Sequence, residues 1–370
     1  MTDYRMYDVQ ATLLTPLHIG SGVELLNEFD FAIYQGRTWR LNENALLAAQ
    51  AVEDPAVAER LARTPPAQLL ERADFRPDSE FFRYVVRGVP RSNAAGAQVK
   101  EQLKDAYDHP YLPGTSLKGA LRTALAWVLW AKKGLKPEAH KLKRSAKFAG
   151  QNYEHELFGR DPNHDLLRAL QVSDSAPVSA AQLMLANAQV IHRNGHLAAP
   201  VELEAVKPDT VFPLTLKVDR ALFSQWAGRD RLQGLSALEQ LATLVQTHTA
   251  ARLKEEVAWF KGVDNARPVL GFLSQLQQMK LPPHLCILQL GWGTGWLDKT
   301  LGSHLQVASR FFDGVMRDYR LARGKRQSGD PFPKSRRVLV QVRRSRDGRT
   351  MARPVSSIGW LLLELKERAT

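Results

Sequence analysis

Hydrophobic and polar residues alternate along several segments of the chain, and this pattern predicts β-strands with one buried face. Two pairs of such segments are close enough to form hairpins, one across residues 35–37 and one across Asn194-Gly195, a dipeptide that favours a tight turn. We expect strands at residues 7–13, 29–34, 38–41, 81–86, 183–191, 201–206, 211–218, 285–290, 338–342 and 358–365.

Apolar residues that recur three and four positions apart predict helices instead. This spacing runs through residues 117–129 and 235–261, and through residues 43–71 with interruptions at prolines. Residues 92–104 are small and polar, which predicts an exposed and mobile segment.

The helix at residues 117–129 begins with turn chemistry. Pro113-Gly114 favours a turn directly before it, and the hydroxyl of Thr115 or Ser116 is placed to cap the first free N–H groups. A helix start with exposed N–H groups attracts anions, because the positive end of the helix dipole lies there.

Two cations follow in this same helix start. Lys118 lies in the first turn, where the dipole disfavours a positive charge, and Arg122 lies one turn later on the same face. Gly119 between them lets a partner approach the backbone closely. The residues alone fit a phosphate site and a capped amphipathic helix with solvated basic side chains equally well. For a phosphate site, replacing Lys118 or Arg122 by alanine weakens binding and leaves the fold intact.

A glycine-rich loop, Gly291-Trp292-Gly293-Thr294-Gly295-Trp296, follows the strand predicted at residues 285–290. A Walker A loop needs glycine immediately before Lys299-Thr300, where this chain has Asp298. The dinucleotide fingerprint fails too, because Trp296 or Asp298 stands where its third glycine belongs. Two tryptophans among three glycines suit base stacking, or packing of the loop on its own sheet.

The charge of the chain indicates a polyanionic partner. Its 51 Lys and Arg residues exceed its 38 Asp and Glu residues, which gives a net charge of +13. Residues 317–353 hold 11 arginines and 2 lysines against 3 aspartates, and residues 132–147 hold only one acid, Glu138. Arginine binds phosphate with two parallel hydrogen bonds and stacks on bases, so nucleic acid is favoured over an anionic membrane surface.

Other classes of protein are not expected. The single cysteine, Cys286, excludes an internal disulfide framework and a cysteine-rich zinc site, and His155 and His164 lack metal-ligand spacing. We find no signal-peptide pattern, no stretch long enough to span a membrane and no basic amphipathic helix with an aromatic face. We therefore expect a cytoplasmic protein without a metal ion and without membrane contact.

The loop at residues 15–22 follows the first predicted strand and contains His18. A lone histidine in this position fits a ligand-binding residue, an acid–base group or, most commonly, a residue that packs at the strand end. Asp30 lies within the pattern of the next strand.

Together these segments resemble the RAMP superfamily of CRISPR proteins, and within it the subunits that lie at the 3′ end of the CRISPR RNA (crRNA) in type III-A (Csm) effector complexes. The resemblance is carried, in order along the chain, by Leu17–Gly22, Tyr111–Arg122, Gly291–Trp296 and Ile358-Gly359-Trp360. It implies an α+β fold of two ferredoxin-like (RRM-related) domains with helical insertions, which we place at residues 1–175 and 176–370.

The resemblance also implies a function. It describes a non-catalytic subunit that binds crRNA, contributes to crRNA maturation and complex assembly, and needs no cofactor. Its partners are the neighbouring backbone RAMP subunit, the other Csm subunits, target RNA and host nucleases acting in trans. The residues that we expect to contact RNA are His18, Gly20, Ser21, Gly114, Thr115, Ser116, Lys118, Gly119, Arg122, Gly291, Trp292, Gly293, Thr294, Gly295, Trp296, Lys299, Arg336 and Arg337.

A catalytic alternative shares the same fold. A metal-independent RNA endonuclease of the guide-processing type would use His18 as a general acid or base on a 2′-hydroxyl, but no second histidine occupies a motif position. In related backbone subunits, an aspartate near the N-terminus cleaves target RNA. Asp30 is its nearest counterpart here, and its place in a strand pattern favours a structural role.

Overall fold

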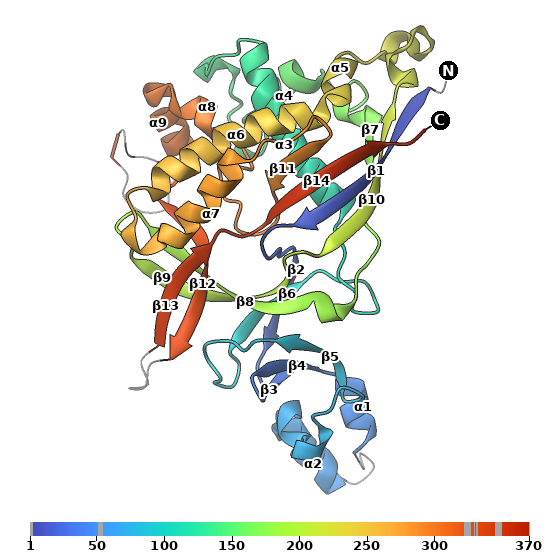
Figure 1. The fold of residues 1–370 in the computed structure, drawn as a ribbon, viewed down its shortest axis with the longest axis vertical. Helices are drawn as coiled ribbons and strands as arrows, with labels where there is room; N and C mark the ends of the chain where they lie inside the picture. Colours follow the sequence, from blue (N-terminus) through green and yellow to red (C-terminus); the bar gives the residue numbers. More distant parts are fainter. Residues whose placement is uncertain are drawn as a thin grey trace.

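The computed structural model describes residues 3–50, 55–321, 327–328, 330, 332–344 and 350–369. Figure 1 shows two β-sheets that lie one above the other along the long axis of the molecule, with most of the helices around the upper sheet. The mixed α+β class that the sequence implies is confirmed.

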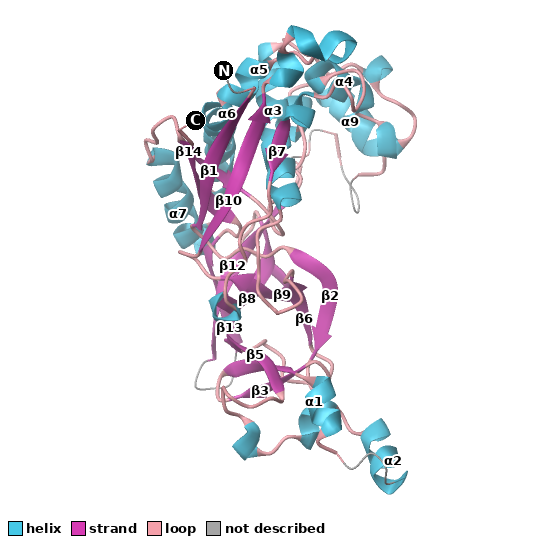
Figure 2. Ribbon diagram, turned by 90° about the vertical axis from the view of Figure 1, so that its right-hand side faces the viewer, coloured by secondary structure: helices cyan, strands magenta, loops and turns pink. Residues whose placement is uncertain are grey.

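In the described part of the chain, the upper sheet has five strands in the order β11-β14-β1-β10-β7, and all of its neighbouring strands are antiparallel. Its helices α3 (Gly114–Lys132) and α6 (Leu241–Phe260) lie against one face (Figure 2). Leu117, Leu121 and Leu125 of α3 are buried in the core between the helices and this sheet. The strands are β1 (Tyr4–Leu13), β7 (Leu170–Val172), β10 (Val211–Asp219), β11 (Leu285–Gln289) and β14 (Trp360–Glu367).

The described residues give the lower sheet nine strands, of which seven follow the order β2-β6-β9-β8-β5-β4-β3. β12 pairs with β8 and with β13, so that the β12–β13 hairpin branches from the middle of the sheet. These strands are β2 (Gly20–Leu26), β3 (Phe31–Tyr34), β4 (Arg37–Leu41), β5 (Phe82–Arg87), β6 (Gln98–Gln102), β8 (Leu183–His192), β9 (Leu197–Val206), β12 (Ser335–Arg344) and β13 (Thr350–Ser356).

Most of the predicted strands occur where alternation predicts them, and both predicted hairpins are confirmed. The mobile segment expected at residues 92–104 is wrong in its second half, because β6 pairs with β2 on one side and β9 on the other. Each sheet takes strands from both halves of the chain, since β1 pairs with β10 and β14, and β6 pairs with β9. The boundary that we placed near residue 175 therefore does not separate the two sheets.

The remaining helices lie outside the two sheets. The pattern at residues 43–71 forms α1 and α2 with short 3-10 turns, at the end of the molecule below β3–β5 (Figure 1). The pattern at residues 235–261 is divided at Gln240 into α5 and α6. Among the described residues, no helix combines the length and the apolar character that crossing a bilayer requires. These helices are α1 (Glu43–Ala48), α2 (Pro55–Arg63), α4 (Gln151–Phe158), α5 (Leu235–Glu239), α7 (Arg267–Gln278), α8 (Gly302–Gln306) and α9 (Ser309–Asp318).

Candidate nucleic-acid interface

Three of the four motifs that carry the family resemblance meet between the two sheets. The Trp292 N–H donates to the His18 carbonyl oxygen at 2.8 Å, and the Gly359 N–H donates to the Pro16 carbonyl oxygen at 2.9 Å. The Leu290 N–H in turn donates to the Gly359 carbonyl oxygen at 2.8 Å. We call this crossing of residues 15–18, 290–293 and 358–360 the motif junction.

Glycines allow the three chain segments of the motif junction to cross. Gly291 has a φ of 81°, and a Cβ atom there would lie 2.5 Å from the His18 carbonyl oxygen. Gly359 has a φ of 82°, and a Cβ atom would overlap the Leu290 carbonyl oxygen. A Cβ atom at Gly293 would overlap the Ile358 side chain. Contacts within the chain require all three glycines, including Gly291 and Gly293, which we expected to contact RNA.

His18 lies inside the motif junction, with 1% of its surface exposed. Its Nδ1 donates to the Glu204 carbonyl oxygen at 2.6 Å, and its ring meets Trp292 edge-on. Burial lowers the pKa of His18 to about 4, because the charged imidazolium is poorly solvated there. The ring is thus neutral and inaccessible, which contradicts the expectation that it contacts RNA.

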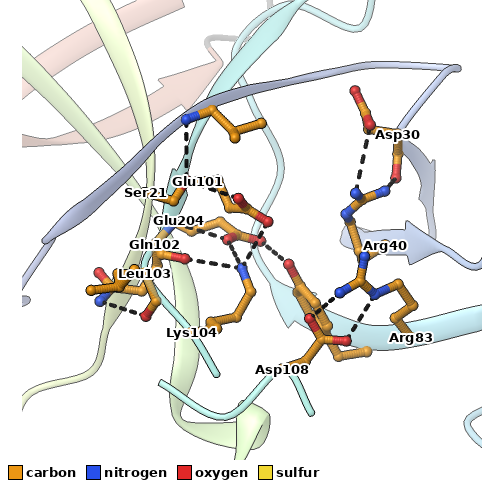
Figure 3. Close-up of polar contacts among 12 residues, drawn as sticks. Ser21, Asp30, Arg40, Arg83, Glu101, Gln102, Leu103, Lys104, Asp108 and Glu204 are labelled. Carbon is orange, nitrogen blue, oxygen red and sulfur yellow. Dashed lines mark hydrogen bonds and ion pairs between the residues drawn. The ribbon is translucent and has the colours of Figure 1, made fainter. Parts of the chain in front are cut away.

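Glu204, whose carbonyl oxygen binds His18, also forms a buried polar network through its carboxylate. Figure 3 shows this network with Gln102 and Lys104. The Glu204 carboxylate accepts hydrogen bonds from the Tyr84 hydroxyl at 2.8 Å and from Lys104 Nζ at 2.8 Å, and Gln102 joins it through its backbone N–H. Sequence reasoning missed this network because its members look like isolated polar residues of separate segments. The signal that the sequence offers is the polar character of residues 98–102, which form β6, a strand paired on both sides.

Gly20 and Ser21 are exposed at the edge of the lower sheet, at the start of β2. The Ser21 hydroxyl donates to Glu101 Oε2 at 2.8 Å (Figure 3). Their accessibility suits contact with a partner, although the hydroxyl already has an acceptor in the chain.

Asp30 closes the turn before β3. Its Oδ2 accepts a hydrogen bond from the Leu26 N–H at 2.8 Å, and its Oδ1 lies 3.6 Å from an Arg40 nitrogen. Arg40 also donates to the Asp30 carbonyl oxygen at 2.6 Å (Figure 3). Both carboxylate oxygens thus have partners in the chain, as a structural role requires.

A carboxylate of the protein itself binds the N-terminal end of α3. The Gly114 N–H donates to Asp174 Oδ1 at 2.7 Å, so a carboxylate of the chain occupies the position expected for a phosphate. A Cβ atom at Gly114 would overlap the carbonyl oxygens of Val172 and Ser173, which explains the glycine. The predicted cap by Thr115 or Ser116 is wrong, because the N-cap residue is Pro113, which has no side-chain acceptor.

The two cations of α3 also bind the chain. Lys118 Nζ donates to the Leu170 carbonyl oxygen at 2.7 Å, and burial lowers the pKa of Lys118. Arg122 Nη1 donates to Asp165 Oδ2 at 2.8 Å, and its guanidinium lies 4.1 Å from the centre of the Phe158 ring. These partners contradict a pair of cations free to bind phosphate.

Two other residues of this helix start are open to solvent. Thr115 and Gly119 are exposed, and a Cβ atom at Gly119 would meet nothing within 4 Å. Ser116 is half-buried, and its backbone N–H donates to the Pro113 carbonyl oxygen at 3.0 Å. Thr115 and Gly119 therefore keep surface for a partner here.

The second half of the glycine-rich loop and the start of β12 line one cavity of about 620 Å³. Arg337 is exposed here, and its guanidinium lies 5.0 Å from the centre of the Trp292 ring. Lys334 adds an exposed cation that our list of contact residues missed, although the Lys-Ser-Arg-Arg cluster signals it. Gly293, Thr294, Gly295, Trp296 and Arg336 complete the predicted residues on this cavity. The structure therefore brings the loop and the arginines together.

Ion pairs form the inner wall of this cavity. Arg336 Nε donates to both oxygens of Glu256 at 2.8 Å, which leaves it less available than Arg337. Arg252, with 2% of its side chain exposed, lies 3.1 Å from Asp298 Oδ1 and 3.1 Å from Glu256 Oε1. This pairing explains the aspartate that replaces the glycine of a Walker A loop.

Trp296 and Lys299 face a second cavity of about 480 Å³, between α3, α4 and α9. Trp296 packs against Phe312 and Phe332, with ring centres 5.7 and 4.9 Å away, so it supports the loop from inside. Lys299 is exposed.

Two lysines of the basic run at residues 132–147 bind groups of the chain. Lys141 lies 3.0 Å from Glu156, and Lys143 donates to Gln151 at 2.6 Å. In the arginine-rich run at residues 317–353, five cations lie outside the described residues, namely Arg323, Lys325, Arg326, Arg346 and Arg349.

Within the described ranges, no cluster of three His, Cys, Asp or Glu residues could hold a metal ion.

Comparisons with known proteins agree on one family. The model of the RAMP superfamily matches residues 10–298. A curated relative, the CRISPR system Cms protein Csm5 of Streptococcus thermophilus, is 27% identical over 256 residues, which are 59% of this chain and 66% of the relative. Csm5 of Mycobacterium tuberculosis is 25% identical over 211 residues, which are 54% of this chain and 51% of the relative. The matches therefore span between about half and about two thirds of these relatives.

Solved structures share the fold over nearly the whole chain. A chain in the cryo-EM structure of a Csm–crRNA–target RNA ternary complex of a type III-A CRISPR–Cas system superposes with a TM-score of 0.71 at 24% identity, covering 97% of this chain and 100% of that chain. The crystal structure of T. onnurineus Csm5 superposes with a TM-score of 0.63 at 22% identity, covering 95% and 99%.

Proposed function

Because the chain belongs to the RAMP superfamily and is related to Csm5 proteins, we propose that it binds crRNA as a subunit of a type III-A effector complex. One observation carries the proposal: exposed Arg337 lines the cavity formed by the glycine-rich loop and β12, and its guanidinium lies over the Trp292 ring, 5.0 Å from the ring centre. A guanidinium beside an indole offers hydrogen-bond donors to a phosphate and an aromatic ring to a base.

The architecture supports this proposal. The elements β1, α3, β7, β10, α6 and β14 follow one another along the chain, and their strands lie in the order β14-β1-β10-β7. This is the arrangement of a ferredoxin-like unit, a fold shared with RNA-binding RRM domains. We infer that the upper sheet is one of the two ferredoxin-like domains expected from the sequence.

The finer role follows the family resemblance. The subunit lies at the 3′ end of the guide, contributes to crRNA maturation and contacts the neighbouring backbone RAMP subunit, other Csm subunits and target RNA. Host nucleases acting in trans complete the maturation.

Binding to RNA tests the proposal directly. We expect the purified chain to bind a single-stranded RNA with the sequence of a crRNA 3′ segment, and Arg337→Ala to weaken this binding about tenfold, as expected for the loss of a charged contact. Arg76→Ala is the matched control, because Arg76 is exposed, does not line the cavity, and follows Phe75, whose ring stacks on Tyr34 of β3. Equal affinities of the two variants would contradict an interface at Arg337.

The maturation role needs the assembled complex. We expect the guides that co-purify with complexes lacking this chain to have longer or more heterogeneous 3′ ends than those from complete complexes, when the bound RNA is sequenced. Unchanged 3′ ends would remove the proposed role in maturation and leave RNA binding standing.

The position of His18 argues against the endonuclease alternative. The buried His18 donates its Nδ1 proton to a backbone carbonyl, so it does not reach a 2′-hydroxyl. We expect no cleavage when precursor RNA is incubated with the purified chain in EDTA, and specific cleavage there would favour the enzyme.

A further inference from the structure

The second cavity lies between α3, α4 and α9, at the helical end of the molecule (Figure 2). It adjoins the cavity of the glycine-rich loop, because Trp296 and Leu321 line both spaces. The Trp296 ring is fixed at this boundary, since a Cβ atom at Gly302 would overlap it and Phe332 packs against it. An RNA strand that is bound at Arg337 therefore has the second cavity next to it.

The walls of the second cavity are mainly apolar. Trp130, Tyr153 and Phe158 are buried and form part of its lining, and Phe311 of α9 is half-buried on it. The volume of about 480 Å³ is sufficient for the flat ring of one nucleobase. Aromatic side chains bind such a ring by stacking.

Hydroxyl groups on this cavity already have acceptors within the chain. The Tyr153 hydroxyl donates to the Lys136 carbonyl oxygen at 2.9 Å, and the Tyr319 hydroxyl donates to the Lys143 carbonyl oxygen at 2.7 Å. The Thr300 hydroxyl donates to a backbone carbonyl oxygen of its own turn. The lining therefore favours stacking of a ring over hydrogen bonds that would distinguish one base from another.

Exposed residues mark the mouth of the second cavity. Ala146, Gly150 and Lys299 line it and are exposed. The ammonium group of Lys299 has no hydrogen bond or ion pair within the described part of the chain, so it is available to a phosphate. Among the described lining residues Glu154 is the one acid, and its carboxylate lies 3.5 Å from Arg122.

The basic run at residues 132–147 reaches the same mouth through Ala146. Lys143, Arg144 and Lys147 are exposed beside it, and residues 139–153 contain no Asp or Glu. An apolar cavity with cations at its mouth suits a polyanion that also carries flat rings. Single-stranded nucleic acid has both properties, whereas an apolar side chain of a protein partner would use the cavity and leave the cations unpaired.

We propose that the second cavity receives one unpaired base of the bound RNA, and that Lys299 and the basic run bind the phosphates next to that base. The ring lies against Phe311, and its polar edge remains at the mouth, where water completes its hydrogen bonds. The cavity accepts any of the four bases, because stacking depends on the ring. The proposal rests on the proposed function, because it extends the RNA interface from the glycine-rich loop to the basic run.

Photocrosslinking tests which side chains a base meets. Single-stranded RNA that contains 5-iodouridine is bound to the full chain and irradiated, and mass spectrometry then identifies the residues that carry RNA. We expect crosslinks at Phe311 or Trp296, in addition to Trp292. Bound RNA that crosslinks to neither Phe311 nor Trp296 would overturn the proposal and leave RNA binding standing.

A protein variant gives an independent measurement. Phe311→Leu keeps an apolar side chain and loses the flat ring, so we expect it to weaken RNA binding about fivefold, for uridine-rich and adenosine-rich RNA alike. Phe29→Leu is the matched control, because Phe29 is 45% exposed and lines neither cavity. Melting temperatures measured alongside establish that both variants fold.

The outcomes separate this proposal from the proposed function. Equal RNA affinities of Phe311→Leu and the natural chain would overturn the base site, and the cavity would then suit an apolar side chain of a protein partner. A loss confined to one kind of base would contradict binding by stacking alone. Failure of the natural chain to bind any RNA would overturn the proposed function itself.

Discussion

Lys118 donates to the Leu170 carbonyl oxygen inside the molecule, whereas Arg337 lies on the Trp292 ring at the surface. Both are cations beside a glycine-containing motif, but their neighbours give them different roles. Lys118 satisfies a backbone group, and Arg337 keeps its donors available to a partner. At the scale of single residues, the neighbours that a side chain meets decide its role.

We expect Lys118→Ala and Arg337→Ala to have opposite effects. Loss of the Lys118 hydrogen bond should lower the free energy of unfolding by about 1 kcal/mol and leave RNA affinity unchanged. Arg337→Ala should keep the melting temperature and weaken RNA binding. Thermal denaturation and a binding titration on both variants check this. A Lys118 variant with natural stability and weakened RNA binding would restore the phosphate site at α3.

His18 makes the stability of the protein depend on pH. Its pKa is about 4 in the folded protein and ordinarily 6.5, so the unfolded chain takes up the proton first as the pH falls. The contribution of the neutral ring is complete above pH 6.5 and is lost as the pH falls towards 4.

Between pH 7 and pH 4 we expect natural protein to lose about 3 kcal/mol more stability than His18→Asn, which keeps a donor and does not titrate. Chemical denaturation across this range measures the difference. His248 and Glu202 titrate there too, with pKa values of about 4 and about 6, but they are common to both proteins. Parallel stability curves would mean that His18 is not buried neutral.

The residues of the candidate interface were only partly predictable. Sequence reasoning could select Arg337 and Trp292 as candidates, because arginine and tryptophan suit RNA wherever they are accessible. The roles of Gly114 and Lys118 were not, because their partners, Asp174 and Leu170, are far away in the sequence and carry no signal of that contact.

At the scale of elements, the motif junction depends on chain crossings that only glycine permits. Gly359 combines a positive φ with an overlap between any Cβ atom and the Leu290 carbonyl oxygen. Gly119 of α3 is a helical glycine with open space around it.

These two glycines predict contrasting alanine variants. Gly359→Ala should lower the free energy of unfolding by about 3 kcal/mol, because backbone strain and the overlap add together. Gly119→Ala should raise it by up to about 1 kcal/mol, since alanine is the better helix former. Denaturant unfolding of both variants tests this, and a stable Gly359→Ala protein would contradict the crossing. A loss of RNA affinity in Gly119→Ala would indicate a partner close to that backbone.

Elements with a clear alternation were predictable, and β6 was not. Its polar residues look like those of a loop, but Gln102 is buried and binds the Ile19 N–H, and Lys100 pairs with Glu24 across the strands. Alternation identifies a strand by its apolar face, so a central strand whose polar side chains find partners in the sheet remains hidden.

At the scale of the whole molecule, we expect the net charge of +13 to govern the proposed binding of RNA. Each phosphate that is neutralised releases counterions from the RNA, so affinity depends on salt concentration.

We expect the logarithm of RNA affinity to fall linearly with the logarithm of salt concentration, with a slope of about −0.7 for each phosphate neutralised. Arg337→Ala should make this slope shallower by about 0.7, and Arg76→Ala should leave it unchanged. Binding titrations at several salt concentrations measure the slopes. Affinity that does not change with salt would contradict an electrostatic interface.

The pairing of β1 bears on how the protein can be made on the ribosome. β1 lies between β10 and β14, and β14 itself lies between β1 and β11. The ribosome synthesises β1 before the other described strands of both sheets and β14 after them. While the elements between β1 and β14 are being made, the nascent chain therefore carries a strand whose second neighbour does not yet exist. The strand pairing of the upper sheet can be completed only when β14, Trp360–Glu367, has left the exit tunnel.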